Sequence, residues 1–209
     1  MTGTARNDPR ELFRRATSQL ATLIGAVTPD QLADPTPCSE YDVRALLDHI
    51  VMGQRRIGFV ADGSDFRDMP PTGPVDDGDW PRTYVQACRA TERAWADDGR
   101  LTAMMTLPFG TLPGAAALAA YVEETATHSW DLAVATGQTD HLDPVLGEAA
   151  LQIALRAVPA EPRGGPVPFG PVVPVPDDAD PYARLAGYLG RTPGPADGQR
   201  RDTFERADR

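Results

Sequence analysis

The sequence predicts one all-helical domain, a four-helix bundle with accessory short helices and loops. Four long segments repeat apolar residues at helical spacing, and a capping residue, a proline or a glycine bounds each of them. The chain has 209 residues, 41% of them hydrophobic, which is enough to bury a core without disulfides. We expect residues 1–193 to form a single domain and the polar, charged residues 194–209 to form a disordered tail.

The first two helices are each expected after a capping residue. Asp8 is the candidate N-cap of the first, and Pro9 takes the first helical position ahead of a periodic apolar face. Ser39 and Asp42 are spaced as a capping box for the second helix, whose apolar face runs to Val60. Both starts are therefore predicted from local sequence.

A loop, a third helix and a short apolar segment follow. Residues 62–79 are rich in Asp, Gly and Pro and show no period, so we expect an exposed loop. The third helix opens at Trp80 and keeps one apolar face through Trp95. Residues 101–109 are apolar but few, and they fit either a strand or an irregular arm.

The second half of the chain contains the longest periodic segment. Residues 113–136 predict the fourth helix of the bundle, and Gly137 is its expected C-cap. Residues 144–158 predict a fifth helix, which a proline- and glycine-rich stretch follows. A last short helix is expected over residues 181–189, capped by Asp180.

Charge and residue usage exclude several classes of function. The 20 basic residues are all arginines, and with 30 acidic residues they leave a net charge of -10, which opposes binding to nucleic acid or to an anionic membrane. Without lysine, the chain cannot form a Schiff base, anchor pyridoxal phosphate or build a phosphate-binding loop. Cys38 and Cys88 are far apart, and we find neither a signal peptide nor a membrane-spanning apolar run, so we expect a cytoplasmic protein.

Two of the three histidines lie on predicted helices close to acidic residues. Glu124 and His128 are spaced i, i+4 on one face of the fourth helix, and Asp131 extends the same ridge. With His49 from the second helix they would supply two imidazoles and one carboxylate, a set typical of a catalytic divalent metal with open coordination positions. The alternative is a surface pair that stabilises the helix by about 0.2 to 0.5 kcal/mol. His141 lies in a loop and is expected to be exposed.

Four ordered parts of the sequence resemble one known family. They are residues 36–49, residues 108–110 with 113–114, residues 124–133 and residues 169–176. Together they resemble the actinobacterial metal-binding proteins related to the N-terminal domain of mycothiol-dependent maleylpyruvate isomerase, within the DinB/YfiT-like superfamily. The resemblance extends from Leu12 to Pro193.

The resemblance implies the fold, the ligands and the cofactor of a metal site. It implies a four-helix bundle in which His49, Glu124 and His128 hold a divalent ion, usually zinc, with nickel, iron or manganese as alternatives. It thereby makes residues 1–193 a single metal-binding domain. It also implies chemistry on a small thiol such as mycothiol, either S-transfer or thiol-dependent isomerisation. The isomerase has a second domain that contributes to its active site and that we do not expect here, so we expect S-transfer rather than isomerisation. Activation of a water at the open metal site is the other reaction expected.

Five further residues are candidates for supporting roles around the ion. Asp131 or Asp48 is expected to orient an imidazole ligand, and Asp131 is the one assigned to the catalytic machinery. Arg55 is assigned to that machinery as well. Arg44 and Arg56 are assigned to binding a carboxylate of the small-molecule substrate or cosubstrate.

Other interpretations of the same residues stay open at this point. Tyr121 and Trp130 have helical spacing and are expected in the core rather than in a binding platform. The protein can also be a non-catalytic metal-binding protein or a metal-free helical interaction domain. Monomer and homodimer are both compatible with a helical bundle.

Overall fold

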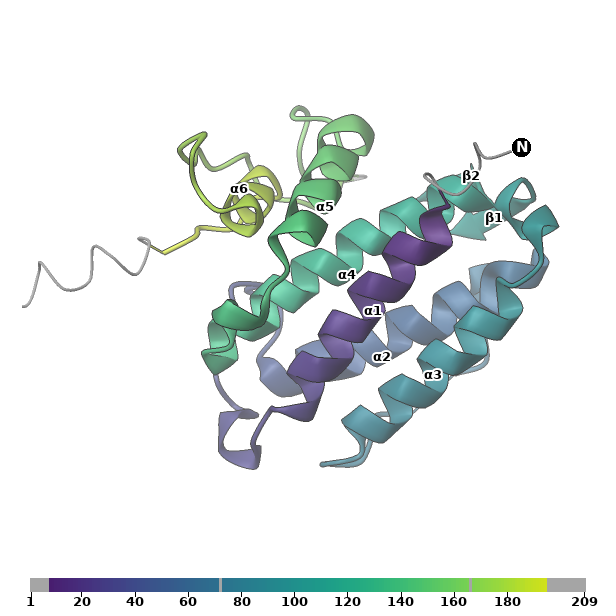
Figure 1. The fold of residues 1–209 in the computed structure, drawn as a ribbon, viewed down its shortest axis with the longest axis horizontal. Coiled ribbons are helices and arrows are strands. Elements are labelled where there is room, and N and C mark those ends of the chain that lie inside the picture. The colour runs from purple at the N-terminus through teal and green to yellow at the C-terminus, as the bar shows by residue number, and fades with distance from the viewer. Residues whose placement is uncertain (1–7, 72, 166, 195–209) are drawn as a thin grey trace, which may run out of the picture.

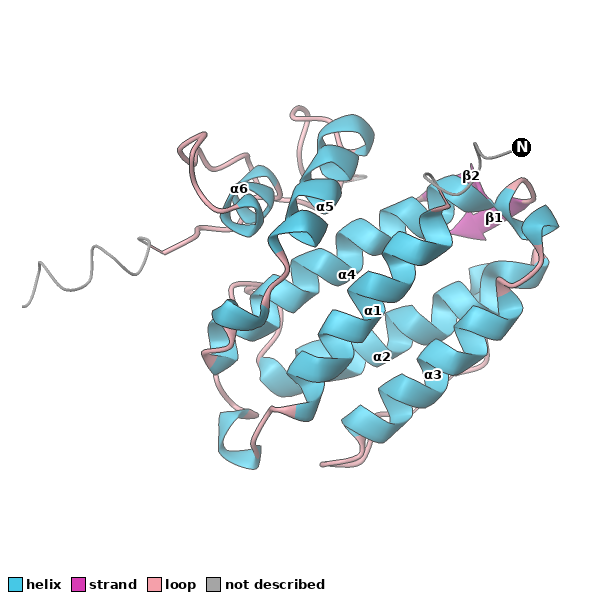
Figure 2. Cartoon of the chain, viewed as in Figure 1, coloured by secondary structure: helices cyan, strands magenta, loops and turns pink. Residues whose placement is uncertain are grey.

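A computed structural model describes residues 8–71, 73–165 and 167–194, which form a mostly helical fold (Figures 1 and 2). The α-helices of this part are α1 Pro9–Gly25, α2 Val43–Phe59, α3 Trp80–Ala94, α4 Gly114–Thr136, α5 Pro144–Ala157 and α6 Pro181–Tyr188. Short 3-10 turns lie at Pro29–Gln31, Val60–Asp62, Phe66–Asp68, Asp98–Leu101 and Thr139–His141, and the strands are β1 Met104–Leu107 and β2 Gly110–Pro113. The predicted helical fold class is confirmed. Apart from Gly194, the predicted tail 194–209 lies outside the described residues.

Local capping signals define several helix ends. Asp8 accepts a hydrogen bond from the backbone N–H of Arg10 (2.9 Å), and Asp180 accepts one from the backbone N–H of Tyr182 (2.8 Å). Gly137 follows α4 with φ of 73°, the left-handed conformation that a glycine C-cap supplies. These three predictions are confirmed because each depends only on neighbouring residues.

The start of α2 differs from the predicted capping box. Its N-cap is Asp42, whose side chain accepts a hydrogen bond from the N–H of Ala45 (2.8 Å). Ser39 lies instead in a turn that the N–H of Tyr41 closes on the carbonyl oxygen of Cys38 (2.9 Å). The capping-box prediction is wrong because this turn occupies the residues that would have formed the first helical turn.

The segment 101–109 contains a strand rather than an irregular arm. β1 pairs with β2 in an antiparallel hairpin, with Met104 opposite Pro113 and Leu107 opposite Gly110. The hairpin lies at the N-terminal end of α4 (Figure 2). The loop 62–79 is largely exposed, as predicted, and contains one of the 3-10 turns.

Helices α1 to α4 pack as a bundle. α2 packs against α3 and α4, and α1 also packs against α3 and α4. α5 packs on α4 and α6 packs on α5, outside the bundle (Figure 1). α4 is therefore covered on two sides, which explains why it is buried around most of its circumference from Tyr121 to Ala133.

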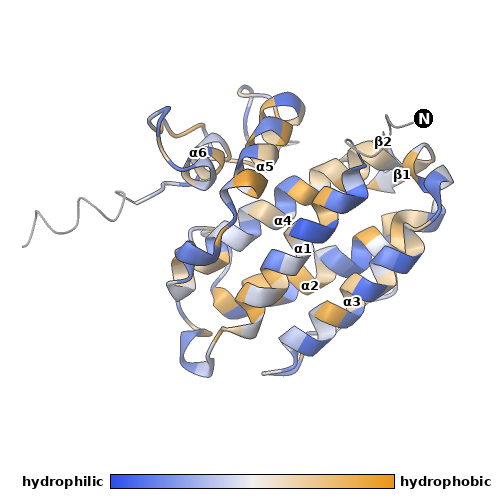
Figure 3. Cartoon of the chain, viewed as in Figure 1, coloured by the Kyte–Doolittle hydropathy of each residue, from blue (hydrophilic) through white to orange (hydrophobic). Residues whose placement is uncertain are grey.

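Two hydrophobic clusters form the core. One joins α4, α5, α6 and the hairpin and includes Leu118, Val122, Leu146, Tyr182 and Met105. The other joins α1, α2, α3 and the C-terminal half of α4 and includes Leu20, Leu46, Ile50, Tyr84 and Leu132. Figure 3 shows hydrophilic and hydrophobic residues alternating around α1 and α3, as expected of amphipathic helices. None of the helices in the described part has the length and apolarity that a bilayer span requires.

Candidate metal centre

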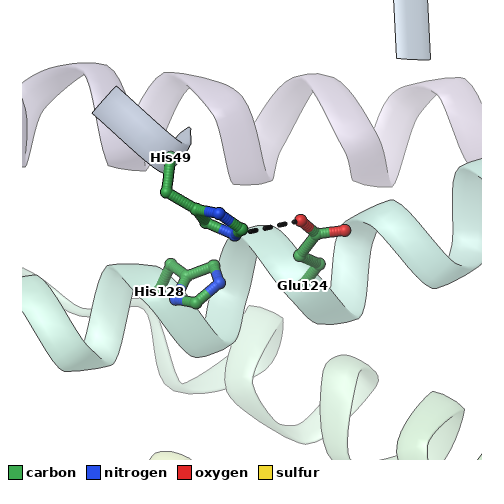
Figure 4. Close-up of side chains that lie close together, drawn as sticks. All are labelled: His49, Glu124 and His128. Atoms are coloured by element: carbon green, nitrogen blue, oxygen red, sulfur yellow. Dashed lines mark ion pairs between the residues drawn. The ribbon is translucent and has the colours of Figure 1, made fainter. Parts of the chain in front are cut away.

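Helices α2 and α4 bring three potential metal ligands to one point (Figure 4). His49 comes from α2, and Glu124 and His128 come from successive turns of α4. One ligand atom from each side chain lies within 4.8 Å of the others. Among the described residues this is the one group of three His, Cys, Asp or Glu side chains close enough to share an ion. The predicted ligands are therefore brought together.

His128 is held by a buried carboxylate. Its Nδ1 lies 3.0 Å from Oδ2 of Asp131, one turn further along α4. Arg191 donates to both oxygens of that carboxylate, from Nε to Oδ1 and from Nη2 to Oδ2, each over 2.9 Å. When Nδ1–H donates to the carboxylate, Nε2 is the ring nitrogen left with a free lone pair, which is the tautomer that a metal ligand needs.

Burial and charge act in opposite directions on this ion pair. Burial favours the neutral form of Asp131, but its hydrogen bonds with His128 and Arg191 outweigh burial and lower the pKa of the carboxyl. The pKa of Arg191 is raised, because its bonds to Asp131 outweigh the opposing effect of its own burial. Asp131 is therefore an anion that supports His128. The sequence predicted this role for either Asp131 or Asp48.

His49 is held by an aromatic residue. The Tyr41 hydroxyl oxygen lies 3.1 Å from Nδ1 of His49, and the two rings stack with centroids 4.9 Å apart. The phenol oxygen can accept a hydrogen bond from Nδ1–H, which again leaves Nε2 for a metal. That Nε2 lies 3.7 Å from Oε1 of Glu124. In the tautomers that carry the proton on Nδ1, both imidazoles have Nδ1 engaged and Nε2 available.

A glycine makes room for the carboxylate ligand. A Cβ atom on Gly53, one helical turn after His49, would lie only 3.3 Å from Oε1 of Glu124. Burial raises the pKa of Glu124, but the hydrogen bond with His49 and the charges of His128, His49 and Arg56 outweigh it, so the pKa lies below its ordinary value. The side chains of His49 and Glu124 keep 29% and 28% exposure, so solvent reaches the centre.

The donor set fits a divalent metal of borderline softness. Two imidazole nitrogens and one carboxylate oxygen suit zinc, nickel, iron or manganese. The lowered pKa makes Glu124 anionic, which is the form of a carboxyl that binds metal. Three protein ligands leave coordination positions for a further molecule.

A second carboxyl lies next to the ligand on α4. Glu123 is 8% exposed and accepts a hydrogen bond from the Thr127 hydroxyl (3.1 Å). Burial, and then the charge of Glu124, raise the pKa of Glu123 to about 7. Glu123 was not predicted from the sequence as a site residue, because its burial depends on the packing of other helices around α4.

The structure corrects the alternative role of Asp48. Its carboxylate accepts hydrogen bonds from the indole N–H of Trp80 (2.7 Å) and from the backbone N–H of Val75 (3.2 Å). Asp48 therefore binds α3 and the loop before it rather than an imidazole. Adjacent helical residues point about 100° apart, so a neighbour of His49 in sequence is not its neighbour in space.

The three predicted arginines lie in different surroundings. Arg56 is close enough for its charge to lower the pKa of Glu124. Arg44 pairs with Asp77 and lies over the ring of Trp80, 5.8 Å from its centroid. Arg55 lines a separate hollow between α2 and α3. The roles assigned to these arginines stay predictions, and Arg56 is the one that the structure brings near the ligands.

Comparison with known proteins adds a family to this geometry. Residues 13–133 match the family described as "Mycothiol maleylpyruvate isomerase N-terminal domain". The chain belongs to this family. As a member of the mycothiol maleylpyruvate isomerase N-terminal domain family, it carries all three candidate ligands within the matched residues, whereas Arg191 lies beyond them.

Two relatives of this family member come from Mycobacterium tuberculosis. They are "Uncharacterized protein MT0763" and "Uncharacterized protein Rv0738", from two strains. Each is 35% identical over 185 residues, which cover 88% of this chain and 98% of the relative. No solved structure matches the chain.

Proposed function

We propose that this protein binds a divalent ion, zinc foremost, through His49, Glu124 and His128 and activates a small thiol of the mycothiol type for S-transfer. One observation carries the proposal: both imidazoles have Nδ1 engaged by another side chain, so that Nε2 of each is available beside one anionic carboxylate. A surface pair on a helix would need neither of those partners. The family description, which names mycothiol, supports a thiol as the activated group.

A bound divalent ion would lower the pKa of a coordinated thiol or water, so that thiolate or hydroxide is available near neutral pH. The residues of the chain would hold the ion and orient its ligands. Tyr41 and Asp131 fix the two imidazole rings, and Arg191 keeps Asp131 anionic. The exposed edges of His49 and Glu124 give a small molecule access. A metal-activated water, acting in hydrolysis, is the other reaction that this ligand set supports.

The metal claim is tested by elemental analysis. Protein purified without a metal-affinity tag is reconstituted with zinc and compared with His128→Ala and Glu124→Ala. His141→Ala is the matched control, because His141 is exposed in the turn before α5. Near-stoichiometric metal in the wild type and the control, lost in the two ligand variants, is the expected result. A wild type without metal after reconstitution would overturn the proposal.

The reaction claim needs a separate assay on the metal-loaded protein. Mycothiol and chlorodinitrobenzene are mixed with the protein, and the conjugate is followed by absorbance. The sulfur forms a bond to the ring carbon, chloride leaves with the electron pair of its bond, and the thiol proton passes to solvent. Conjugation above the rate of the His128→Ala protein is expected. Equal rates would refute S-transfer and leave the metal site as a structural or hydrolytic one.

A structural ion is the second candidate, and the Asp131–Arg191 pair favours it. This pair ties the chain after α6 to α4 at the residue that holds His128, so an ion there would stiffen the packing of α6. Water proton relaxation on manganese-loaded protein separates the two candidates. An exchangeable water on the ion favours catalysis, and its absence favours the structural role.

A further inference from the structure

Three unpartnered polar side chains face one small hollow beside the metal ligands. The hollow lies among α1, α2, α3 and α4, and its wall includes Glu124 and His128. Gln54, Tyr84 and Tyr121 line it as well, one from each of three helices. Within the described part of the chain, six buried side-chain atoms form no hydrogen bond of normal geometry, and three of them are Gln54 Nε2 and the hydroxyls of Tyr84 and Tyr121. The Tyr84 hydroxyl lies near Cys88 and the Tyr121 hydroxyl near Arg56.

These side chains are deeply buried. Gln54, Tyr84 and Tyr121 are 4%, 1% and 3% exposed. Buried polar groups in native proteins are nearly always paired, with protein or with a bound molecule, because an unpaired one destabilises the fold. One such atom could be a local defect of packing. Three of them gathered at one hollow indicate a site that a polar group completes.

The hollow is small and reaches the metal centre. Its cavity volume is about 20 Å³, which is room for one water molecule or for one small polar group of a larger ligand. The rest of its wall consists of Leu20, Ile50, Gly53 and Thr125. A molecule bound at His128 and Glu124 can therefore extend one terminal group inward among the three polar side chains.

The side chains that line the hollow indicate which kind of ligand group would bind there. The Gln54 amide and the two phenols can all donate hydrogen bonds. Burial raises the pKa of Tyr84 and of Tyr121, so both hydroxyls keep their protons. Arg56 is close enough for its charge to act on the Tyr121 hydroxyl and on Glu124. A group that accepts several hydrogen bonds satisfies the three donors, and Arg56 together with a bound ion would offset the repulsion between its negative charge and Glu124.

We infer that Gln54, Tyr84 and Tyr121 form a carboxylate-binding subsite, which receives one end of a small anionic ligand whose other end lies at the metal centre. The inference rests on the proposed function, because it places the subsite next to a bound ion. It names the substrate class as a small molecule with a terminal carboxylate. It also gives Tyr121, which the sequence analysis expected to be only a core residue, a second role.

The test measures binding of acetate to cobalt(II)-loaded protein, through the visible spectrum of the ion and by calorimetry. Acetamide is the uncharged probe of the same shape. The variants are Tyr121→Phe, Tyr84→Phe and Gln54→Leu. The matched control is Tyr188→Phe on α6, where the lost hydroxyl donates to the carbonyl of Val158. Cobalt content and thermal unfolding are recorded for every protein.

We expect acetate to bind the wild type more tightly than acetamide. Tyr121→Phe and Gln54→Leu should each raise the acetate dissociation constant about tenfold or more, because a hydrogen bond to a charged group is lost. Their cobalt content should match the wild type. The two Tyr→Phe variants of the subsite should unfold at the same or a higher temperature, since each loses an unpaired hydroxyl. Tyr188→Phe should leave the acetate affinity unchanged.

Two negative results are distinguishable. If the three variants keep cobalt and bind acetate as the wild type does, the hollow holds a resident water and the inference is overturned alone. If the wild type binds neither cobalt nor zinc, the proposed function fails, and the subsite fails with it. Should Gln54→Leu not fold, the Tyr→Phe variants still decide, because each removes a single oxygen atom.

Discussion

The carboxylate of Asp131 and the guanidinium of Arg191 form a bidentate ion pair between residues 60 positions apart in sequence. The Asp131 side chain is fully buried, and the Arg191 side chain keeps 11% exposure. The same carboxylate lies 3.0 Å from Nδ1 of His128. The chain that follows α6 therefore positions a metal-ligand candidate on α4, although it lies outside the residues that match the family.

Removing this arginine should damage both the fold and the metal centre. Arg191→Ala leaves Asp131 as an uncompensated buried charge, so we expect the free energy of unfolding to fall by about 3 to 5 kcal/mol. Metal affinity should fall about 10- to 100-fold, because His128 loses its fixed partner. Urea denaturation and competition with a chromophoric chelator measure the two effects.

Arg184→Ala is the control for that variant. Arg184 lies on α6 and forms a partly exposed pair with Glu148 (3.5 Å), whose loss should cost less than about 1 kcal/mol. Arg191→Lys keeps the charge but not the two-pronged geometry, and it should give an intermediate metal affinity. A metal affinity that is the same in all three variants would contradict a positioning role for Arg191.

Gly53 should be required for metal binding rather than for stability. Gly53→Ala places a Cβ 3.3 Å from Oε1 of Glu124, so the carboxylate must shift by a few tenths of an ångström. We expect zinc affinity to fall about tenfold, the lower end of the effect of residues that orient ligands. Stability of the metal-free protein should be unchanged or higher, since alanine favours a helix by up to about 1 kcal/mol over glycine. Gly25→Ala, with nothing within 4 Å of its Cβ, should leave zinc affinity unaltered.

The pair between Arg15 and Asp143 should make stability depend on pH in the acid range. Burial opposes ionisation of Asp143, but the hydrogen bonds from Arg15 and from the N–H of Val145 outweigh it and lower the pKa of this carboxyl. A lowered pKa means that the ionised form stabilises the fold. This contribution is present above the ordinary pKa of 3.8 and is lost as pH falls through the lowered value.

Asp143→Asn isolates this contribution. Asparagine can still cap α5, as Asp143 does for the N–H of Val145 (3.0 Å), but it cannot pair with Arg15 as an anion. We expect the variant to be less stable by up to about 1 kcal/mol at neutral pH, because the pair is partly exposed. The difference should vanish in strong acid. Urea denaturation across this range measures it, and a difference that grows on acidification would contradict the assignment.

The fold was predictable where its signals are local. Asp8 and Gly137 bound helices through contacts with neighbouring residues, and both were predicted. Ser39 misled because the turn around it is closed by Tyr41 and Cys38, which the spacing of a capping box does not reveal. Propensity and spacing describe a segment by itself, so they fail where a competing turn takes the same residues.

The candidate site, like the fold, was predictable where its signals are local. Glu124 and His128 share one face of α4 by helical spacing. His49 was predicted beside them from the second helix, and the resemblance implies the same three ligands. Tyr41 and Arg191 were not predicted as site residues. Tyr41 lies outside the helix that carries its partner His49, and Arg191 lies outside the helix that carries its partner Asp131. Only the packing of the chain before α2 and after α6 brings them there. Periodicity finds ligands that share a helix, and it cannot find partners that come from another element.

An ion shared between α2 and α4 should stabilise the fold against heat. His49 and the pair Glu124 and His128 come from helices separated in sequence, so an ion bound to all three exists only in the folded protein. Zinc at 100 times its dissociation constant should add about 2.7 kcal/mol to the free energy of unfolding. For a chain of this size, that raises the unfolding temperature by about 5 to 10 °C. Differential scanning calorimetry with zinc and then with excess chelator measures the shift. His141→Ala should show the full shift and His128→Ala little of it, whereas equal shifts in both would mean that zinc binds elsewhere.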